Sequence, residues 1–79
     1  MNVKVRFWKP DAQGFAGNDY AYFTHLDLIK GDIVVAPTKR NPMQAAIVTR
    51  INVPNEELSL AYLYNLREIE KRWEGDLPT

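Results

Sequence analysis

The stretch LIKGDIVVAP, residues 28–37, decides the predicted fold. Gly31 can adopt a turn conformation with positive φ at low cost, and the β-branched residues after Asp32 indicate a buried strand. Pro37 cannot donate a hydrogen bond to a neighbouring strand, so this strand ends there or lies at a sheet edge. A turn followed by a strand of this kind predicts one wall of a small β-barrel.

The segments around this wall also have the pattern of strands. Residues 2–8 alternate in polarity with a period of two, which is typical of a strand with one solvated face. The apolar face consists of Val3, Val5 and Phe7, and the other face consists of Lys4, Arg6 and Trp8. Further strands are predicted over residues 20–24, 32–37 and 43–52. A long loop over residues 9–19 and a hairpin tip over residues 38–42 connect them.

The last third of the chain changes its pattern. Apolar residues recur there at the spacing of one helical face, namely at Leu58, Tyr62, Leu66, Ile69 and Trp73. Pro54 and Asn55 before them and Gly75 after them are typical of helix ends, so we predict a helix over about residues 56–74. The alternative is a shorter helix to about Tyr64, followed by a strand over residues 66–71 that closes the barrel.

Length and composition predict a single domain. The chain has 79 residues, with the barrel expected over about residues 2–52 and the helix behind it. It has no cysteine, so it forms no disulfide, which suits a cytoplasmic location. No apolar run approaches the length of a membrane span, so we expect no membrane partner. The expected fold class is therefore mainly β: a small antiparallel SH3-like or OB-like barrel of four to five strands with a C-terminal helix.

Charge is balanced overall but uneven along the chain. The ten Lys and Arg residues equal the ten Asp and Glu residues in number. Residues 1–50 carry a net charge of +3, and residues 51–79 carry −3. A dedicated nucleic-acid-binding protein is normally more basic than this. The uneven distribution is compatible with steering of a charged partner and with the two parts complementing each other within one fold.

Residues 20–51 resemble the N-terminal DNA-binding domain of the primosomal helicase PriA. The shared pattern is an aromatic strand, a leucine-containing turn, the Gly31-Asp32 pair and a valine-rich strand that ends in Pro37. In that family the domain captures the 3′ end of a DNA strand. The chain has no phosphate-cradling loop of the G-x-x-x-x-G-K-[ST] type and no glycine-rich tip between Pro37 and Met43. Short bacteriophage-encoded proteins carry a similar pattern, which implies an accessory or host-interaction protein.

The sequence gives little support for catalysis. His25 is the single histidine, and the spacing to Asp27 is more typical of a solvated turn than of an acid–base pair. Ser59 does not lie in a nucleophile-elbow context. One histidine and scattered acids provide no set of metal ligands. We therefore expect a protein that is not an enzyme and that has no metal and no cofactor.

Two binding functions remain, and the first is binding of a protein partner. Five apolar residues are candidates for such a contact: Tyr64, Leu63, Leu60, Phe15 and Trp8. The first three lie off the main face of the predicted helix, where they either pack internally or meet a partner. Phe15 either plugs the barrel mouth or contacts a partner. The leading hypothesis is a phage-encoded protein that occludes a host factor, and a homodimer is a further alternative.

The second function is binding of single-stranded nucleic acid. Its candidate residues are Lys4, Arg6 and Trp8 on the first strand and Lys39 and Arg40 on the hairpin tip. Tyr20, Tyr22 and Phe23 either stack on bases or fill the core. The acidic helix would repel phosphates wherever it lies near this face.

Overall fold

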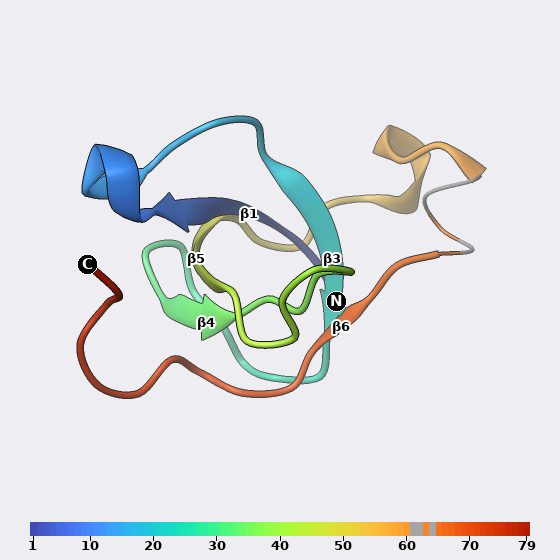
Figure 1. Cartoon of the computed structure of the whole chain (residues 1–79). Helices are drawn as coiled ribbons and strands as arrows, with labels where there is room; N and C mark the ends of the chain where they lie inside the picture. Colours follow the sequence, from blue (N-terminus) through green and yellow to red (C-terminus); the bar gives the residue numbers. More distant parts are fainter. Residues whose placement is uncertain (61–62, 64) are drawn as a thin grey trace.

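The fold is a curled β-sheet that forms a half-barrel (Figure 1). The computed structural model describes residues 1–60, 63 and 65–79. Its strands are β1 (Asn2–Lys9), β2 (Gly14–Phe15), β3 (Tyr20–Thr24), β4 (Ile33–Val35), β5 (Ala45–Arg50) and β6 (Glu68–Ile69). The strand order is β4-β5-β1-β3-β6, and β2 pairs with β1. The chain also forms two short 3-10 turns among its described residues, η1 (Pro10–Ala12) and η2 (Asn55–Glu57). The prediction of a mainly β fold is confirmed.

The turn before β4 forms as the opening stretch predicts. Gly31 has a φ of +98°, a conformation that residues with a side chain rarely adopt. The turn is closed by Ile29 and Asp32, since Asp32 N donates to Ile29 O and the Asp32 carboxylate accepts from Ile29 N. Gly31 N also donates to Val48 O at 2.9 Å, which ties the turn to β5. Residues 28–37 are therefore one wall of the half-barrel.

The predicted helix over residues 56–74 is wrong. Among the described residues this region contains the end of η2, an extended backbone at Leu58, helical backbone at Leu60 and Leu63, and the strand β6, which pairs in parallel with β3. We call residues 67–73 the closing segment, because its backbone joins the two ends of the curled sheet. Phe23 N donates to Arg67 O at 2.9 Å on the β3 side. On the β4 side, Val35 N donates to Lys71 O at 3.1 Å.

The physical reason lies in the sheet edges. Backbone groups of β3 and β4 that face away from their neighbours need partners, and a helix satisfies only its own backbone. The closing segment supplies those partners and at the same time buries Ile69, which is 0% exposed. The alternative prediction, a strand over residues 66–71 that closes the barrel, agrees with this part of the structure.

The core lies on the concave face of the sheet. Alternate residues of β1 point into it, as the period of two predicts. The fully enclosed cluster consists of Val3, Val5, Tyr22, Leu28, Val34, Ala36, Ala46, Val48 and Ile69. The core thus draws on all the main strands and on the closing segment.

The predicted loop over residues 9–19 is only partly a loop. β1 continues to Lys9, η1 turns the chain, and β2 returns along β1 with Phe15 opposite Trp8. Gln13 ends the turn in a left-handed conformation with a φ of 49°. β2 and β3 are thus successive antiparallel neighbours of the same strand, and Phe15 is held in a fixed position on it.

Removing the Ile69 side chain should destabilise the fold strongly. We expect Ile69→Ala to lower the free energy of unfolding by about 2–5 kcal/mol, because it leaves a cavity in a fully buried site. Ile29→Ala is the matched control, since Ile29 is 62% exposed and its truncation should change stability by less than about 0.5 kcal/mol. Urea unfolding followed by circular dichroism measures both. If both substitutions changed the free energy of unfolding equally, the closing segment would not bury Ile69 in the core.

Thr24 should act as a buried polar link to the closing segment. Its hydroxyl donates to Ile69 O at 2.9 Å and accepts from Leu26 N at 3.0 Å. Thr24→Val keeps the shape but leaves both backbone groups unpaired, so it should cost about 1–3 kcal/mol. Thr24→Ser keeps the hydroxyl and should retain most of this hydrogen-bonding contribution. The same urea measurement compares them, and a Val variant at least as stable as the Ser variant would refute this role.

Candidate functional site

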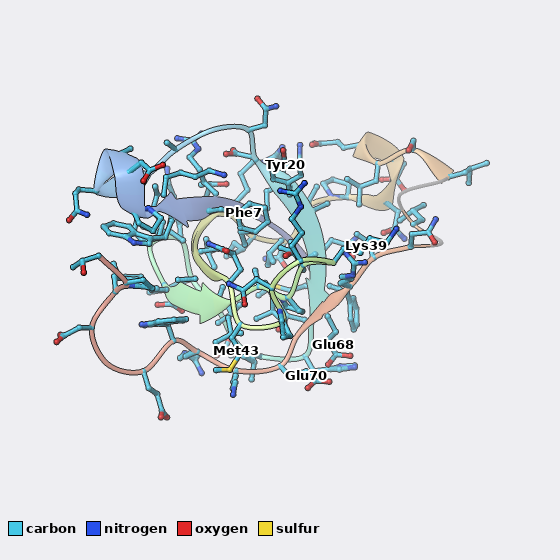
Figure 2. The ribbon with its side chains drawn as sticks, viewed as in Figure 1. Phe7, Tyr20, Lys39, Met43, Glu68 and Glu70 are labelled. Atoms are coloured by element: carbon cyan, nitrogen blue, oxygen red, sulfur yellow. The ribbon has the colours of Figure 1, made fainter. Side chains whose placement is uncertain are left out.

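The inner face of β1 continues beyond the part that the core covers. Val3 and Val5 are fully buried, whereas the next residue on that face, Phe7, is only half-buried. Tyr20 lies opposite Val5 on β3 and is 40% exposed. The rings of Phe7 and Tyr20 stack, with centroids 5.1 Å apart and planes 21° from parallel. We call this stacked pair the mouth platform (Figure 2).

A shallow pocket of about 350 Å³ adjoins the mouth platform. It is lined by Phe7, Tyr20, Ala21, Tyr22, Thr38, Asn65 and Arg67. Among these described lining residues one carries a positive charge and none is acidic. The pocket therefore combines aromatic surface, polar side chains and a guanidinium group.

The loop that borders the pocket is held in place by hydrogen bonds. The Tyr22 hydroxyl donates to Pro37 O at 2.8 Å, which fixes the base of the loop to β3. At the tip, Thr38 N donates to Asn41 O at 2.8 Å and Asn41 N donates to the Thr38 hydroxyl at 3.0 Å. This tip presents Lys39 and Arg40, which are both exposed. The two candidate cations of the hairpin tip are thus carried by a hydrogen-bonded turn, on which Lys39 is labelled in Figure 2.

Three cations lie on or next to the residues of the mouth platform and its pocket. The Lys9 ammonium lies 5.9 Å from the centroid of the Phe7 ring, within the range of a cation–π contact. Arg67 lines the pocket, and Lys39 follows the lining residue Thr38 in the chain. Lys9 and Arg67 thus place positive charge next to an aromatic surface, with Lys39 on the adjoining turn, in a protein with no net charge.

The strand face predicted for nucleic acid is neutralised by nearby acids. Arg6 Nε lies 2.8 Å from the Asp19 carboxylate, which also accepts a hydrogen bond from the Thr49 hydroxyl. Glu57, whose pKa is lowered mainly by its hydrogen bonds with Arg50, also has its pKa lowered by the charge of Lys4. The structure therefore separates Lys4 and Arg6, which face carboxylates, from the exposed tip.

Trp8 and Phe15 lie together on the outer face of β1, opposite the mouth platform. Their rings meet edge to face, with centroids 5.2 Å apart and an angle of 68° between the planes. The Trp8 indole N–H donates to Pro78 O at 2.6 Å. Phe15 is thus placed by its contact with Trp8, and both side chains are half-buried.

The remaining candidates for partner contact lie near residue 60. Leu60 is 71% exposed. Leu63 is half-buried and lines a separate shallow hollow together with Phe23 and Leu66. Tyr64 lies outside the described residues. These candidates form no continuous helical face with Ile69, because Ile69 belongs to β6.

The region of the single histidine is part of the scaffold. His25 is exposed and its ring meets Phe23 edge to face at 4.8 Å. The Asp27 carbonyl accepts a hydrogen bond from Arg72 at 2.9 Å. Over residues 1–60, 63 and 65–79 there is no group of acids and histidine that could hold a metal ion. The same residues include no helix that is long and apolar enough to span a membrane.

The sequence does not single out Phe7, Lys9, Thr38, Asn65 or Arg67 as site residues. Phe7 was assigned to the apolar face of the first strand, and its position at the open end of that face was the available signal. Arg67 was placed in a helix, so no pattern in the sequence brought it beside Tyr20. Only the parallel pairing of β6 with β3 does so.

Comparison with known proteins identifies no relatives: no family model, no curated protein and no solved structure matches this chain. The resemblance of residues 20–51 to the PriA domain therefore stays a prediction. The geometry of the chain itself is therefore the basis for inferring its function.

An exposed ion pair joins β5 to η2. Two nitrogens of Arg50 lie 2.7 and 3.2 Å from the two carboxylate oxygens of Glu57. The hydrogen bonds from Arg50 hold the pKa of Glu57 below its ordinary value of 4.5. A lowered pKa means that the ionised carboxyl stabilises the folded state.

The contribution of Glu57 to stability should depend on pH. It is present above the pKa of the unfolded chain and disappears as the pH falls through the lower pKa of the folded state. Glu57→Gln should therefore destabilise slightly at about pH 7, and this effect should shrink as the pH falls below the ordinary pKa of a glutamate and through the lower pKa of the folded state. Urea unfolding at several pH values measures the difference. A difference that stays constant down to low pH would show that the ionised pair does not contribute.

Proposed function

We propose that this protein binds single-stranded nucleic acid at the mouth platform. The observation that supports it is the stacked pair of Phe7 and Tyr20, an inner-face aromatic surface left open beside three cations. Proteins that bind single strands combine aromatic rings, on which bases stack, with positive charge that follows the backbone. Small barrels of the OB type bind strands in this manner, and we propose an SH3-like or OB-like classification on the same grounds.

Each part of the site has a distinct role in this proposal. A base stacks on the exposed face of Tyr20, and Phe7 supports that ring from the other side. Arg67 and Lys39 contact phosphates at the rim of the pocket. Thr38 and Asn65 also line the pocket. The resemblance of residues 20–51 to a DNA-binding domain is in keeping with this arrangement.

The small number of cations limits the electrostatic part of the binding. The two phosphate contacts from Arg67 and Lys39 give a slope of log affinity against log salt of about −1.4 on a single strand. Stacking on Tyr20 does not depend on salt in this way, so the proposal requires a moderate salt dependence with a residual affinity at high salt.

The leading sequence hypothesis, a protein that occludes a host factor, loses its main support. It depended on a second apolar face of the helix over residues 56–74, and that helix is not formed. An origin in a bacteriophage, a cytoplasmic location, the homodimer and the absence of enzymatic activity all stay predictions.

Tyr20→Ala should weaken binding of a fluorescent oligothymidylate by a factor of about 5–150, equivalent to the loss of one stacked base, about 1–3 kcal/mol. Fluorescence anisotropy at two salt concentrations measures the affinity. Ile29→Ala removes a comparably exposed apolar side chain that does not line the pocket, and should leave the affinity unchanged.

A charge reversal tests the cationic rim in the same assay. Arg67→Glu should weaken binding and flatten the salt dependence, whereas Lys30→Glu changes the net charge equally at a residue outside the pocket lining. If both charge reversals weaken binding alike, the nucleic acid is attracted only by the net charge of the protein and not by Arg67 in particular. Full affinity of both Tyr20→Ala and Arg67→Glu would refute the proposed site.

A further inference from the structure

A second shallow hollow lies beside the pocket of the mouth platform and shares Arg67 with it. Its volume is also about 350 Å³, and Pro37, which precedes the pocket residue Thr38 in the chain, lines it. We call it the closing-segment hollow, because the charged residues that line it belong to the closing segment, namely Arg67, Glu68, Glu70 and Lys71. Figure 2 shows the labelled rings of the mouth platform in the upper part of the view and Glu68 and Glu70 in the lower part.

The two hollows differ in the charge of their described lining residues. In the pocket of the mouth platform, Arg67 is the one charged residue among them. In the closing-segment hollow, the carboxylates of Glu68 and Glu70 offset the charges of Arg67 and Lys71. None of these side chains forms an ion pair within the described part of the chain. A phosphate is therefore attracted to the first hollow, whereas the carboxylates repel it in the second.

We propose that Glu68 and Glu70 confine a bound single strand to the pocket of the mouth platform and keep its phosphates out of the closing-segment hollow. This inference rests on the proposed function. Binding sites gain specificity from repulsive groups as well as from attractive ones. The two carboxylates leave the phosphate contacts of Arg67 and Lys39 in place and make the neighbouring path over Lys71 unfavourable. They are specificity-determining residues that the strand does not touch.

The expected consequence is a short binding site. A strand that is confined to the pocket of the mouth platform makes the same phosphate contacts whatever its length, so a longer strand gains no further electrostatic contact. Without the two carboxylates, the closing-segment hollow presents Arg67 and Lys71 without compensation. A strand long enough to reach Lys71 then makes one more phosphate contact, which steepens the slope of log affinity against log salt by about 0.7.

The test compares two oligothymidylates of about 4 and about 16 nucleotides, which span the site sizes of single OB folds. Fluorescence anisotropy on the full-length chain gives the ratio of the long-strand affinity to the short-strand affinity. Glu68→Gln combined with Glu70→Gln should raise this ratio by a factor of about 2–5 at physiological salt and steepen the salt slope for the long strand alone. Glutamine keeps the size of the side chain and removes its charge. Adding Lys71→Gln should return the ratio to the wild-type value.

The matched control is Glu56→Gln combined with Asp76→Asn. It changes the net charge equally at two exposed residues that line neither hollow, so it should leave the ratio unchanged. An equal ratio in the variant of Glu68 and Glu70 and in this control overturns the proposal. A raised ratio that persists after Lys71→Gln is added also overturns it, because the additional contact then lies outside the closing-segment hollow.

Failure of the proposed function has a different result in the same assay. If the wild type binds neither oligothymidylate, or if Tyr20→Ala leaves both affinities intact, the strand does not bind at the mouth platform and both proposals fail. If binding depends on Tyr20 but the ratio does not respond to the two glutamine substitutions, this inference alone fails.

Discussion

The pairing of residues 67–73 with both ends of the curled sheet is the constraint on which the rest of the structure depends. Val35 lies on β4 at one end of the strand order, Phe23 lies on β3 next to β6 at the other end, and each donates a backbone hydrogen bond to this one segment. The segment also contributes Ile69 to the core and accepts the hydroxyl hydrogen of Thr24. A short stretch of extended chain thus satisfies two sheet edges and completes the apolar core of a domain with few residues to spare.

The closing segment also positions residues next to both faces of β1. Where the closing segment begins, it brings Arg67 beside the stacked rings of Phe7 and Tyr20. Where it ends, Trp73 pairs with Ile33 and directs the following residues toward Trp8. Because neighbouring residues of β1 point to opposite faces, one strand supplies an aromatic residue to each surface. The ring pairs Phe7–Tyr20 and Trp8–Phe15 therefore lie on opposite faces of β1.

Several basic side chains of this neutral chain form ion pairs with acidic ones. The ion pairs Arg6–Asp19 and Arg50–Glu57 bring basic side chains of the outer face together with carboxylates. No acid is found among the described residues that line the platform pocket, although Arg67 also lines a neighbouring hollow together with Glu68 and Glu70. Overall charge is a poor guide to binding when the two signs are segregated between faces of one small domain.

The sequence by itself determined the elements whose signals are local. The period of two in residues 2–8, the positive φ of Gly31 and the end of a strand before Pro37 all follow from the backbone preferences of those residues. Tertiary structure alone decided the region after residue 55. The spacing of Leu66, Ile69 and Trp73 fits a helical face, yet β6 is stable because of its contacts with the core and its hydrogen bonds to β3, a strand more than forty residues away in the chain. Tertiary structure also decided that the rings of Phe7 and Tyr20 stay accessible to solvent. The extent of a core depends on which distant segments of the chain cover it.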